Sequence, residues 1–215
     1  MYNLTIALAK GRILDDVEAL WRTSGWPWPY VSRQLWFPPQ ADRPGVVIAR
    51  GPDIPKLVER GIASFGIVGR DVLEEQADAD VLEVLDLDIA PCRMVLASLE
   101  GRWPEGPARV ASKYPEVTRG YFRRKAHPVE VVGLSGSLEL APHIGLAPYI
   151  VDIVQTGRTL RQHALQEIDT VFHSTARLIA NPAAWRRGGE SEHVYDTLQA
   201  VVEGQADVSH RGGFR

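Results

Sequence analysis

The residues best suited to bind an anion lie at 155–159, with the sequence QTGRT, between the apolar run YIVDIV and a predicted helix. Backbone N–H groups at such a turn point outward, and Gly157 has no Cβ to keep a ligand away. Thr156 and Thr159 add hydroxyl donors, and Arg158 adds a positive charge. This combination suits a monophosphate. The alternative is that Thr159 only caps the helix and Gly157 only makes the turn.

Two carboxylates are expected beside this loop. Asp152 interrupts an apolar strand, where an unpaired carboxylate is costly, and it stands near the carboxyl end, where open α/β sheets bind ligands. Glu139 follows another predicted strand, in GSLELAP. Sugar hydroxyls next to a bound phosphate would satisfy Asp152. A helix cap or a hydrogen bond between lobes would also satisfy Asp152, and Glu139 could simply complement a helix dipole.

Five cations stand at the ends of predicted strands. Lys10 and Arg12 flank a glycine in AKGR, Arg33 lies in SRQL, Arg50 begins RGPD, and Arg93 opens a long strand. Their placement favours a pyrophosphate or polyphosphate. The alternative is a solvated surface charge, which is the usual role of Lys and Arg.

Other kinds of chemistry find little support. The six histidines lack metal-ligand spacing, Cys92 is the only cysteine, and no nucleophile elbow or catalytic dyad is evident, so we expect no protein-bound metal. A net charge of -3 argues against nucleic-acid or acidic-membrane partners. The apolar run near the N-terminus ends at once in Lys10 and Arg12, which is too short for a signal peptide or membrane span. We therefore expect a cytoplasmic protein.

The positions of these residues depend on alternating strands and helices. Strands are predicted at 4–8, 46–49, 64–69, 81–87, 92–99, 129–134, 149–154 and 172–181, and helices after Arg12, at 54–60, from Pro115, at 160–168 and at 190–203, with a frayed tail from Gly204. This pattern predicts an α/β protein with mixed sheets and helices on both faces. The extended segment 81–99 suits a crossover between two lobes. Lobe one is predicted at 1–90 plus 172–215, and lobe two, with the anion loop, at 91–171.

Seven segments, in this order, resemble the catalytic subunit of ATP phosphoribosyltransferase in its short form: LTIALAKGRILDD, SRQL, DIPKLVERGIASFGIVGRDVL, ASKYP, GSLELAPHIGLA, DIVQTGRTL and ARLIAN. The resemblance covers nearly the whole chain, and the order and spacing of the segments make it specific. It implies a two-lobed fold like the type II periplasmic binding proteins, with a cleft between the lobes.

The resemblance also implies an activity and partners. In this reaction N1 of ATP attacks C1 of phosphoribosyl pyrophosphate and releases pyrophosphate, with substrate-bound Mg²⁺, as the first step of histidine biosynthesis. The resemblance to the short form implies a regulatory subunit built like histidyl-tRNA synthetase as partner. A homodimer of this chain within a hetero-octamer is therefore expected. A non-catalytic two-lobed sensor and an inactive paralogue remain the alternatives.

By resemblance, the site residues take specific roles. Thr156, Gly157, Arg158 and Thr159 would hold the 5′-phosphate; Asp152 and Glu139 would be the catalytic residues at the ribose; and Lys10, Arg12, Arg33, Arg50 and Arg93 would face pyrophosphate or ATP phosphates. Three features depart from the family pattern, one of them QHAL in place of an Asn-Gly type of turn. Ala9 replaces a proline, and Pro148 replaces an aspartate that would lie beside the cleft helix, so we expect both changes to affect substrate affinity.

Overall fold

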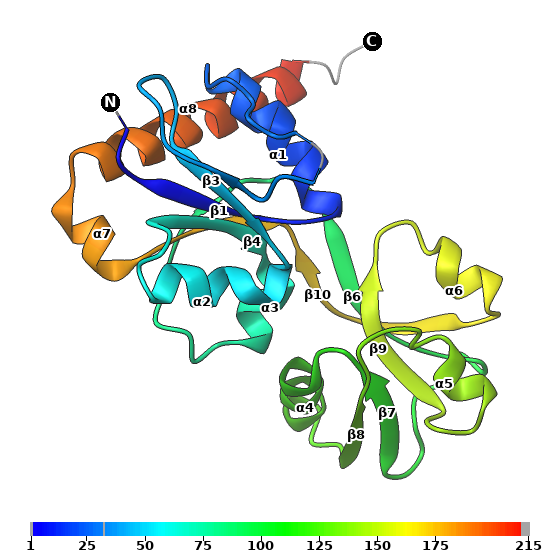
Figure 1. The fold of residues 1–215 in the computed structure, drawn as a ribbon. Coiled ribbons are helices and arrows are strands. Elements are labelled where there is room, and N and C mark those ends of the chain that lie inside the picture. Colours follow the sequence, from blue (N-terminus) through cyan, green and yellow to red (C-terminus); the bar gives the residue numbers. More distant parts are fainter. Residues whose placement is uncertain (1, 32, 212–215) are drawn as a thin grey trace. The chain divides into compact units, whose positions relative to one another are not determined.

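The computed structural model describes residues 2–31 and 33–211, with 205–211 described by their backbone only. The chain forms two compact units (Figure 1). The first contains residues up to 73, 77–90 and from 175 onward, and the second contains 74–76 and 91–174. Each unit has its own sheet and its own cores.

The first unit is built on a six-stranded mixed sheet in the order β2-β3-β1-β4-β11-β5. Strand β1 pairs in parallel with β3 and β4, whereas β11 is antiparallel to β4 and β5, and β2 is antiparallel to β3. The strands are β1 (Thr5–Ala9), β2 (Trp36–Phe37), β3 (Gly45–Ala49), β4 (Phe65–Gly69), β5 (Leu82–Asp86) and β11 (Ala176–Ala180).

Helices cover both faces of this sheet because side chains alternate along each strand (Figure 1). Ile6 and Leu8 of β1 enter the core under α1 and α8, while Ala7 and Ala9 enter the core under α2. The helices of this unit are α1 (Arg12–Thr23), α2 (Ile54–Glu59), α3 (Arg70–Glu75), α7 (Pro182–Arg187) and α8 (Glu190–Arg211), with a 3₁₀ turn at Gly51–Asp53.

The second unit has a five-stranded sheet in the order β10-β6-β9-β7-β8. Strands β7, β8 and β9 are parallel, and β6 runs antiparallel to both β9 and β10. Helix α4 covers one face, and α5 and α6 cover the other. The elements are β6 (Cys92–Ser98), β7 (Ala108–Ser112), α4 (Pro115–Arg124), β8 (Val129–Gly133), α5 (Leu140–His143), β9 (Tyr149–Val154), α6 (Arg158–Gln162) and β10 (Gln166–Ser174).

The helix expected at 160–168 is wrong beyond its first turn. Helix α6 ends at Gln162, Ala164 adopts a left-handed conformation with φ 51°, and β10 begins at Gln166. Irregular register at two points in β10 brings Ile168, Val171 and Phe172 into contact with one core. Their uneven spacing breaks the two-residue period of a strand and so resembles a helical pattern. The single strand expected at 172–181 is likewise divided into the end of β10 and β11.

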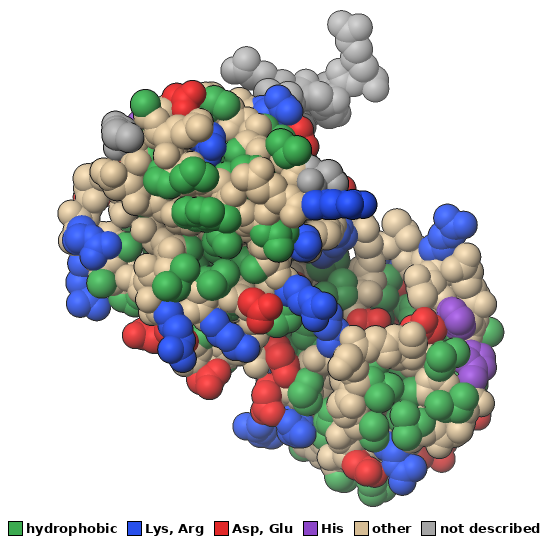
Figure 2. Space-filling model, in the orientation of Figure 1, with side chains coloured by type: hydrophobic (Ala, Val, Ile, Leu, Met, Phe, Trp, Pro, Cys, Tyr) green, Lys and Arg blue, Asp and Glu red, His purple; other side chains and the backbone are tan. Residues whose placement is uncertain are grey.

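The expectation of a frayed tail from Gly204 is also wrong as far as Arg211, because α8 continues to that residue. Residues 212–215 lie outside the described part. Within it, no helix combines the length and the apolar character that a membrane crossing requires. Basic and acidic side chains are interspersed on the face shown in Figure 2.

Candidate active site

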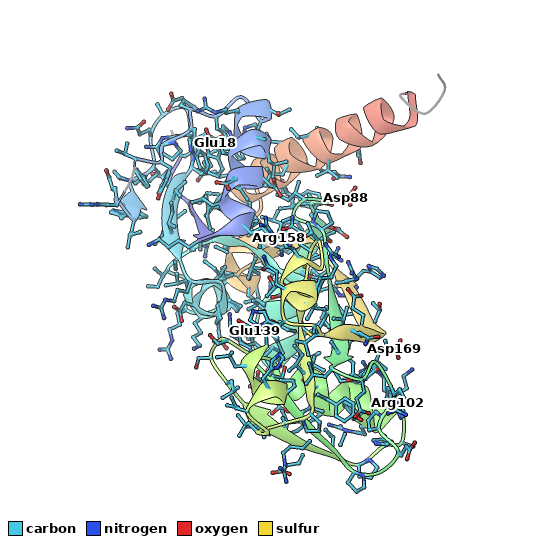
Figure 3. All side chains as sticks on the ribbon, turned by 90° about the vertical axis from the view of Figure 1, so that its right-hand side faces the viewer. Glu18, Asp88, Arg102, Glu139, Arg158 and Asp169 are labelled. Atoms are coloured by element: carbon cyan, nitrogen blue, oxygen red, sulfur yellow. The ribbon has the colours of Figure 1, made fainter. Side chains whose placement is uncertain are left out.

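The parallel strands of the second unit bring several predicted site residues to one edge of its sheet. Ser112 of β7 pairs with Val151 of β9, so the residues that follow both strands lie at the same edge. Arg93, at the beginning of antiparallel β6, pairs with Val154 and therefore lies there too. Figure 3 labels Arg158 at the start of α6 and Glu139 directly before α5.

The loop 155–159 turns at a left-handed glycine directly before α6. Gly157 is left-handed, with φ 71°, and is buried, whereas Thr156, Arg158 and Thr159 are exposed. The N–H of Arg158 lies 3.5 Å from Thr156 Oγ1. No acceptor among the described residues meets the N–H groups of 156, 157, 159 and 160. Because α6 has only five residues, its dipole adds little, and any anion at this loop would depend on the loop amides themselves.

Asp152 is partly buried on the face of β9 that α5 and α6 cover. Its Oδ1 accepts the N–H of Ile153 at 2.8 Å. Burial raises the pKa of Asp152, and the charge of Glu139 adds to that rise, whereas the Ile153 N–H and the charge of Lys113 oppose it. Glu139 is also partly buried, and its side chain makes no capping hydrogen bond to the backbone at the start of α5. The two carboxylates and Lys113 therefore interact electrostatically.

Lys113 is a residue that sequence reasoning missed. It follows β7 directly, and continuing the β7–β9 register places it beside Asp152. The side chain is exposed, and no described carboxylate lies within ion-pair distance of it. The available signal is its position directly after the largely apolar segment ARVAS (108–112), since the other cations were identified by their positions at the ends of predicted strands.

Arg93 is engaged by the protein itself. Its guanidinium donates to both carboxylate oxygens of Glu167, over 3.1 Å from Nε and 2.5 Å from Nη2. Its Nη1 also donates to the carbonyl oxygen of Gln155 at 3.4 Å. Glu167 was missed because it was expected on a helix, and no local pattern links it to a residue 74 positions away.

Four predicted cations lie at one edge of the first unit's sheet. Ala9 pairs with Ala49, and the N–H of Lys10 donates to Ala49 O at 2.7 Å, so the residues after β1 and β3 are neighbours. Arg33 precedes β2, whose antiparallel pairing with β3 brings it to the same edge. The four are Lys10, Arg12, Arg33 and Arg50. Within the described part of the chain, Lys10, Arg33 and Arg50 have no carboxylate at ion-pair distance.

Pro148 lies at the end of β9 that is opposite to the loop 155–159. It precedes β9, whereas the anion loop follows this strand of six residues, so the two are separated by about 20 Å at the usual rise per residue. Pro148 lines a small hollow with Ser98 and Tyr149, at the opposite end of the sheet. Pro142 of α5 lines the same hollow, and the expected effect of Pro148 on substrate affinity stays a prediction.

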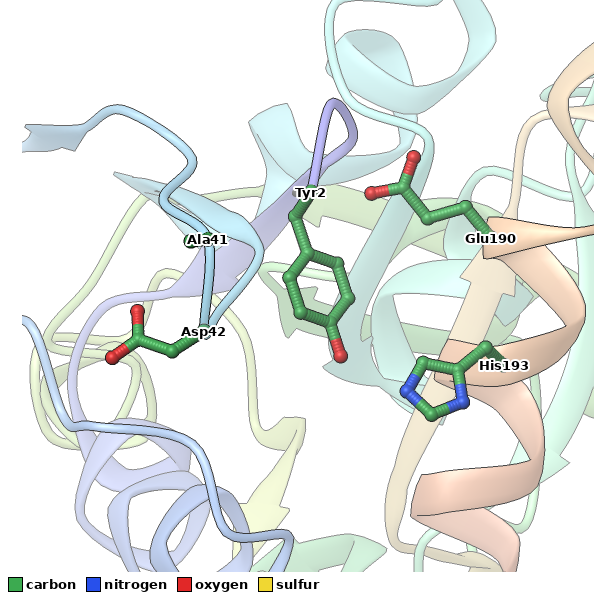
Figure 4. A pocket seen from close by; sticks show the side chains of 5 residues that line it. All are labelled: Tyr2, Ala41, Asp42, Glu190 and His193. Carbon is green, nitrogen blue, oxygen red and sulfur yellow. The ribbon is translucent and has the colours of Figure 1, made fainter.

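A hollow in the first unit contains none of the predicted residues. It is lined by Tyr2, Ala41, Asp42, Glu190 and His193 (Figure 4). Glu190 accepts the N–H of Asn3 at 2.6 Å, and the ring of His193 stacks on Tyr2. These contacts hold the N-terminal segment against α8.

Comparison with known proteins shows the family. The family model described as HisG, ATP phosphoribosyltransferase, matches residues 50–203. The ATP phosphoribosyltransferase of Geobacillus kaustophilus (strain HTA426) is 43% identical over 204 residues, which cover 93% of this chain and 98% of that relative. The chain belongs to the ATP phosphoribosyltransferase family. Its activity is the transfer of a phosphoribosyl group to ATP, the first step of histidine biosynthesis, as the sequence predicted.

Solved structures agree with this membership and with the predicted fold. A chain of the ATP phosphoribosyl transferase (HisG:HisZ) complex from Thermotoga maritima has a TM-score of 0.78 and 33% identity, covering 94% of this ATP phosphoribosyltransferase and 99% of that chain. The periplasmic aliphatic sulphonate binding protein SsuA from Escherichia coli has a TM-score of 0.58 at 13% identity, covering 97% and 71% respectively. The second likeness concerns the fold alone. The two-lobed, type II periplasmic-binding-protein-like class is thus confirmed.

Proposed function

We propose that this ATP phosphoribosyltransferase holds the 5′-phosphate of phosphoribosyl pyrophosphate in the loop 155–159. The observation that carries this proposal is the set of loop N–H groups without an acceptor in the described chain, arranged around left-handed Gly157. Consecutive outward amides form a concave site for an anion. The hydroxyls of Thr156 and Thr159 and the charge of Arg158 complete a donor set for a monophosphate.

Asp152 and Glu139 then stand where the ribose of a substrate anchored in this loop would lie. N1 of adenine has a free lone pair at neutral pH, so the protein must align it with C1 rather than remove a proton from it. As the bond from C1 to pyrophosphate breaks, positive charge develops on the sugar ring. Two carboxylates can offset that charge, and both lie at the loop edge of the sheet. Lys113 favours the ionised form of Asp152.

The first-unit cations Lys10, Arg12, Arg33 and Arg50 would bind pyrophosphate or the phosphates of ATP. Mg²⁺ would arrive bound to these phosphates, and it would neutralise part of the charge on the leaving group. Among the described residues, no three His, Cys, Asp or Glu side chains are grouped as metal ligands. Mg²⁺ that arrives with substrate phosphates needs only one or two protein carboxylates as further ligands.

A regulatory subunit is the partner we propose. The Thermotoga maritima relative is a HisG:HisZ complex, and this chain covers 99% of the matching chain. We expect a homodimer of this chain to assemble with a subunit built like histidyl-tRNA synthetase in a hetero-octamer within the cytoplasm.

Crystals soaked with phosphoribosyl pyrophosphate and Mg²⁺ test the anchoring loop directly. We expect phosphate oxygens within hydrogen-bond distance of the amides at 156–160. In parallel, the protein mixed with ATP, Mg²⁺ and this substrate should form the N1-alkylated adenine, which is followed by its ultraviolet absorbance. Turnover with a loop that stays empty at saturating substrate would disprove the assignment of the loop.

A further inference from the structure

Arg93 and Glu167 form an ion pair, and both side chains contact the backbone of the loop 155–159. Glu167 of β10 receives two hydrogen bonds from Arg93 of β6, in the two-point geometry that carboxylate and guanidinium prefer. The side chains are only 30% and 35% exposed for Arg93 and Glu167, respectively. Elsewhere in the second unit, the Arg109–Glu130 pair is 53% and 66% exposed and has one contact, at 2.9 Å.

The pair touches the loop at two places. Arg93 Nη1 donates to the carbonyl oxygen of Gln155, the first loop residue. A β-carbon built on Gly157 would lie 3.5 Å from Oε1 of Glu167 and 3.0 Å from Nη1 of Arg161. The carboxylate therefore packs against the left-handed glycine while its partner holds the start of the loop. Both contacts are with backbone that directs amides outward.

The charge of Glu167 should by itself oppose an anion in this loop. A carboxylate near a phosphate repels it. Glu167 therefore does not attract the anion directly, and Arg93 uses three of its five N–H donors on Glu167 and Gln155. The contacts of both side chains with the loop backbone point instead to a role in loop geometry.

We propose that Glu167 is a positioning residue for ATP phosphoribosyltransferase activity: acting through Arg93, it holds the loop 155–159 in its anion-binding form. This assignment rests on the proposed role of the loop. It also gives Arg93 a different role from that of a substrate ligand.

The test compares Glu167→Gln with the wild type by titration calorimetry against phosphoribosyl pyrophosphate and Mg²⁺, and by hydrogen exchange of the ligand-free protein. Charge and geometry predict opposite signs, because removing a carboxylate alone favours anion binding. We expect binding to weaken about tenfold and the amides of 156–160 to exchange faster, with an unchanged melting temperature. Glu130→Gln, which removes the Arg109 partner, is the matched control and should alter neither measurement.

Arg93→Lys changes the other partner of the ion pair and removes its two-point hydrogen bonding. It keeps the proposal testable if Glu167→Gln fails to fold. We expect the same loss, and no further loss in the double variant, because the two residues act as one unit. Unchanged or tighter binding by Glu167→Gln, with weaker binding by Arg93→Lys, would overturn the proposal and make Arg93 a direct ligand. A different outcome is that the wild type does not bind the substrate while the loop amides of Glu167→Gln still exchange faster. That result would refute the assigned function of the loop and retain the role of the Arg93–Glu167 pair in holding its conformation.

Discussion

Gly157 has two separate reasons to be glycine. Its φ of 71° is strained by about 1–2 kcal/mol for any residue with a β-carbon, and that carbon would meet Arg161 at 3.0 Å. The guanidinium of exposed Arg161 can move away, so the main cost is the backbone strain at positive φ. That strain acts on the loop whose amides are the proposed phosphate donors.

We expect Gly157→Ala to weaken phosphoribosyl pyrophosphate binding at least tenfold while the chain stays folded, as measured by calorimetry and circular dichroism. Gly145→Ala is the matched control, since Gly145 is also left-handed, with φ 74°, but has open space around its α-carbon. It should show the conformational cost without the loss of affinity. Equal affinity of the Gly157 variant and wild type would remove the loop from substrate binding.

Asp152 combines a proposed catalytic role with a cost in stability. Burial raises its pKa, so between the ordinary carboxyl value and this raised value the native state binds more protons than the unfolded state. The free energy of unfolding then falls as pH rises through that window, and the cost is complete once the pH is above the raised pKa.

For Asp152→Asn we expect a turnover about 100-fold lower than that of wild type and a smaller change in substrate binding. We also expect the variant to have a higher free energy of unfolding than wild type, and this gain should be larger at pH 7 than at pH 3. Asparagine keeps an acceptor for the Ile153 N–H, so the stability gain reports the removed charge. Steady-state kinetics and urea titration at both pH values measure these quantities. Full turnover by the variant would exclude Asp152 from the reaction.

At the scale of elements, the turn between α6 and β10 decides where Glu167 lies. Ala164 is exposed and left-handed at φ 51°, and it ends the helical turn before β10 pairs with β6. An alanine in this conformation is strained. The tertiary pairing of β10 therefore outweighs the local preference of the sequence for a longer helix.

Ala164→Gly should raise the free energy of unfolding by about 0.5–1 kcal/mol, because glycine adopts positive φ without strain. Ala200→Gly, at an exposed position within α8, should lower it by about 1 kcal/mol. Urea titrations of both variants give the comparison. A destabilised Ala164→Gly would mean that the turn is not left-handed in solution.

At the scale of the whole molecule, the two units have separate cores. Ile6 is fully buried in the sheet of the first unit and Ile150 in that of the second. Either side chain truncated to alanine loses packing worth about 2–5 kcal/mol. The loss is local to one core.

We therefore expect Ile150→Ala to reduce hydrogen-exchange protection in residues 91–174 and to leave the first unit's strands protected. Ile6→Ala should give the reverse pattern. Mass spectrometry of peptic fragments measures both. Equal loss of protection throughout the chain in either variant would show that the units open together.

The sequence by itself determined features that are local in the chain. The alternation of apolar residues predicted most strands, and QTGRT contains its glycine, hydroxyls and charge within five residues. The family followed from seven such segments in order. Each of these signals is carried by neighbours in sequence, where side-chain type and backbone preference act directly.

Only the tertiary structure decided what depends on pairing between distant strands. The irregular antiparallel ladder of β10 and β6 brings Glu167 to Arg93, and the β7–β9 register brings Lys113 to Asp152. The direction of β9 separates Pro148 from the loop. Strand register is set by the burial of whole faces and by hydrogen bonds between distant segments, so the residues it joins carry no mark of each other in the sequence.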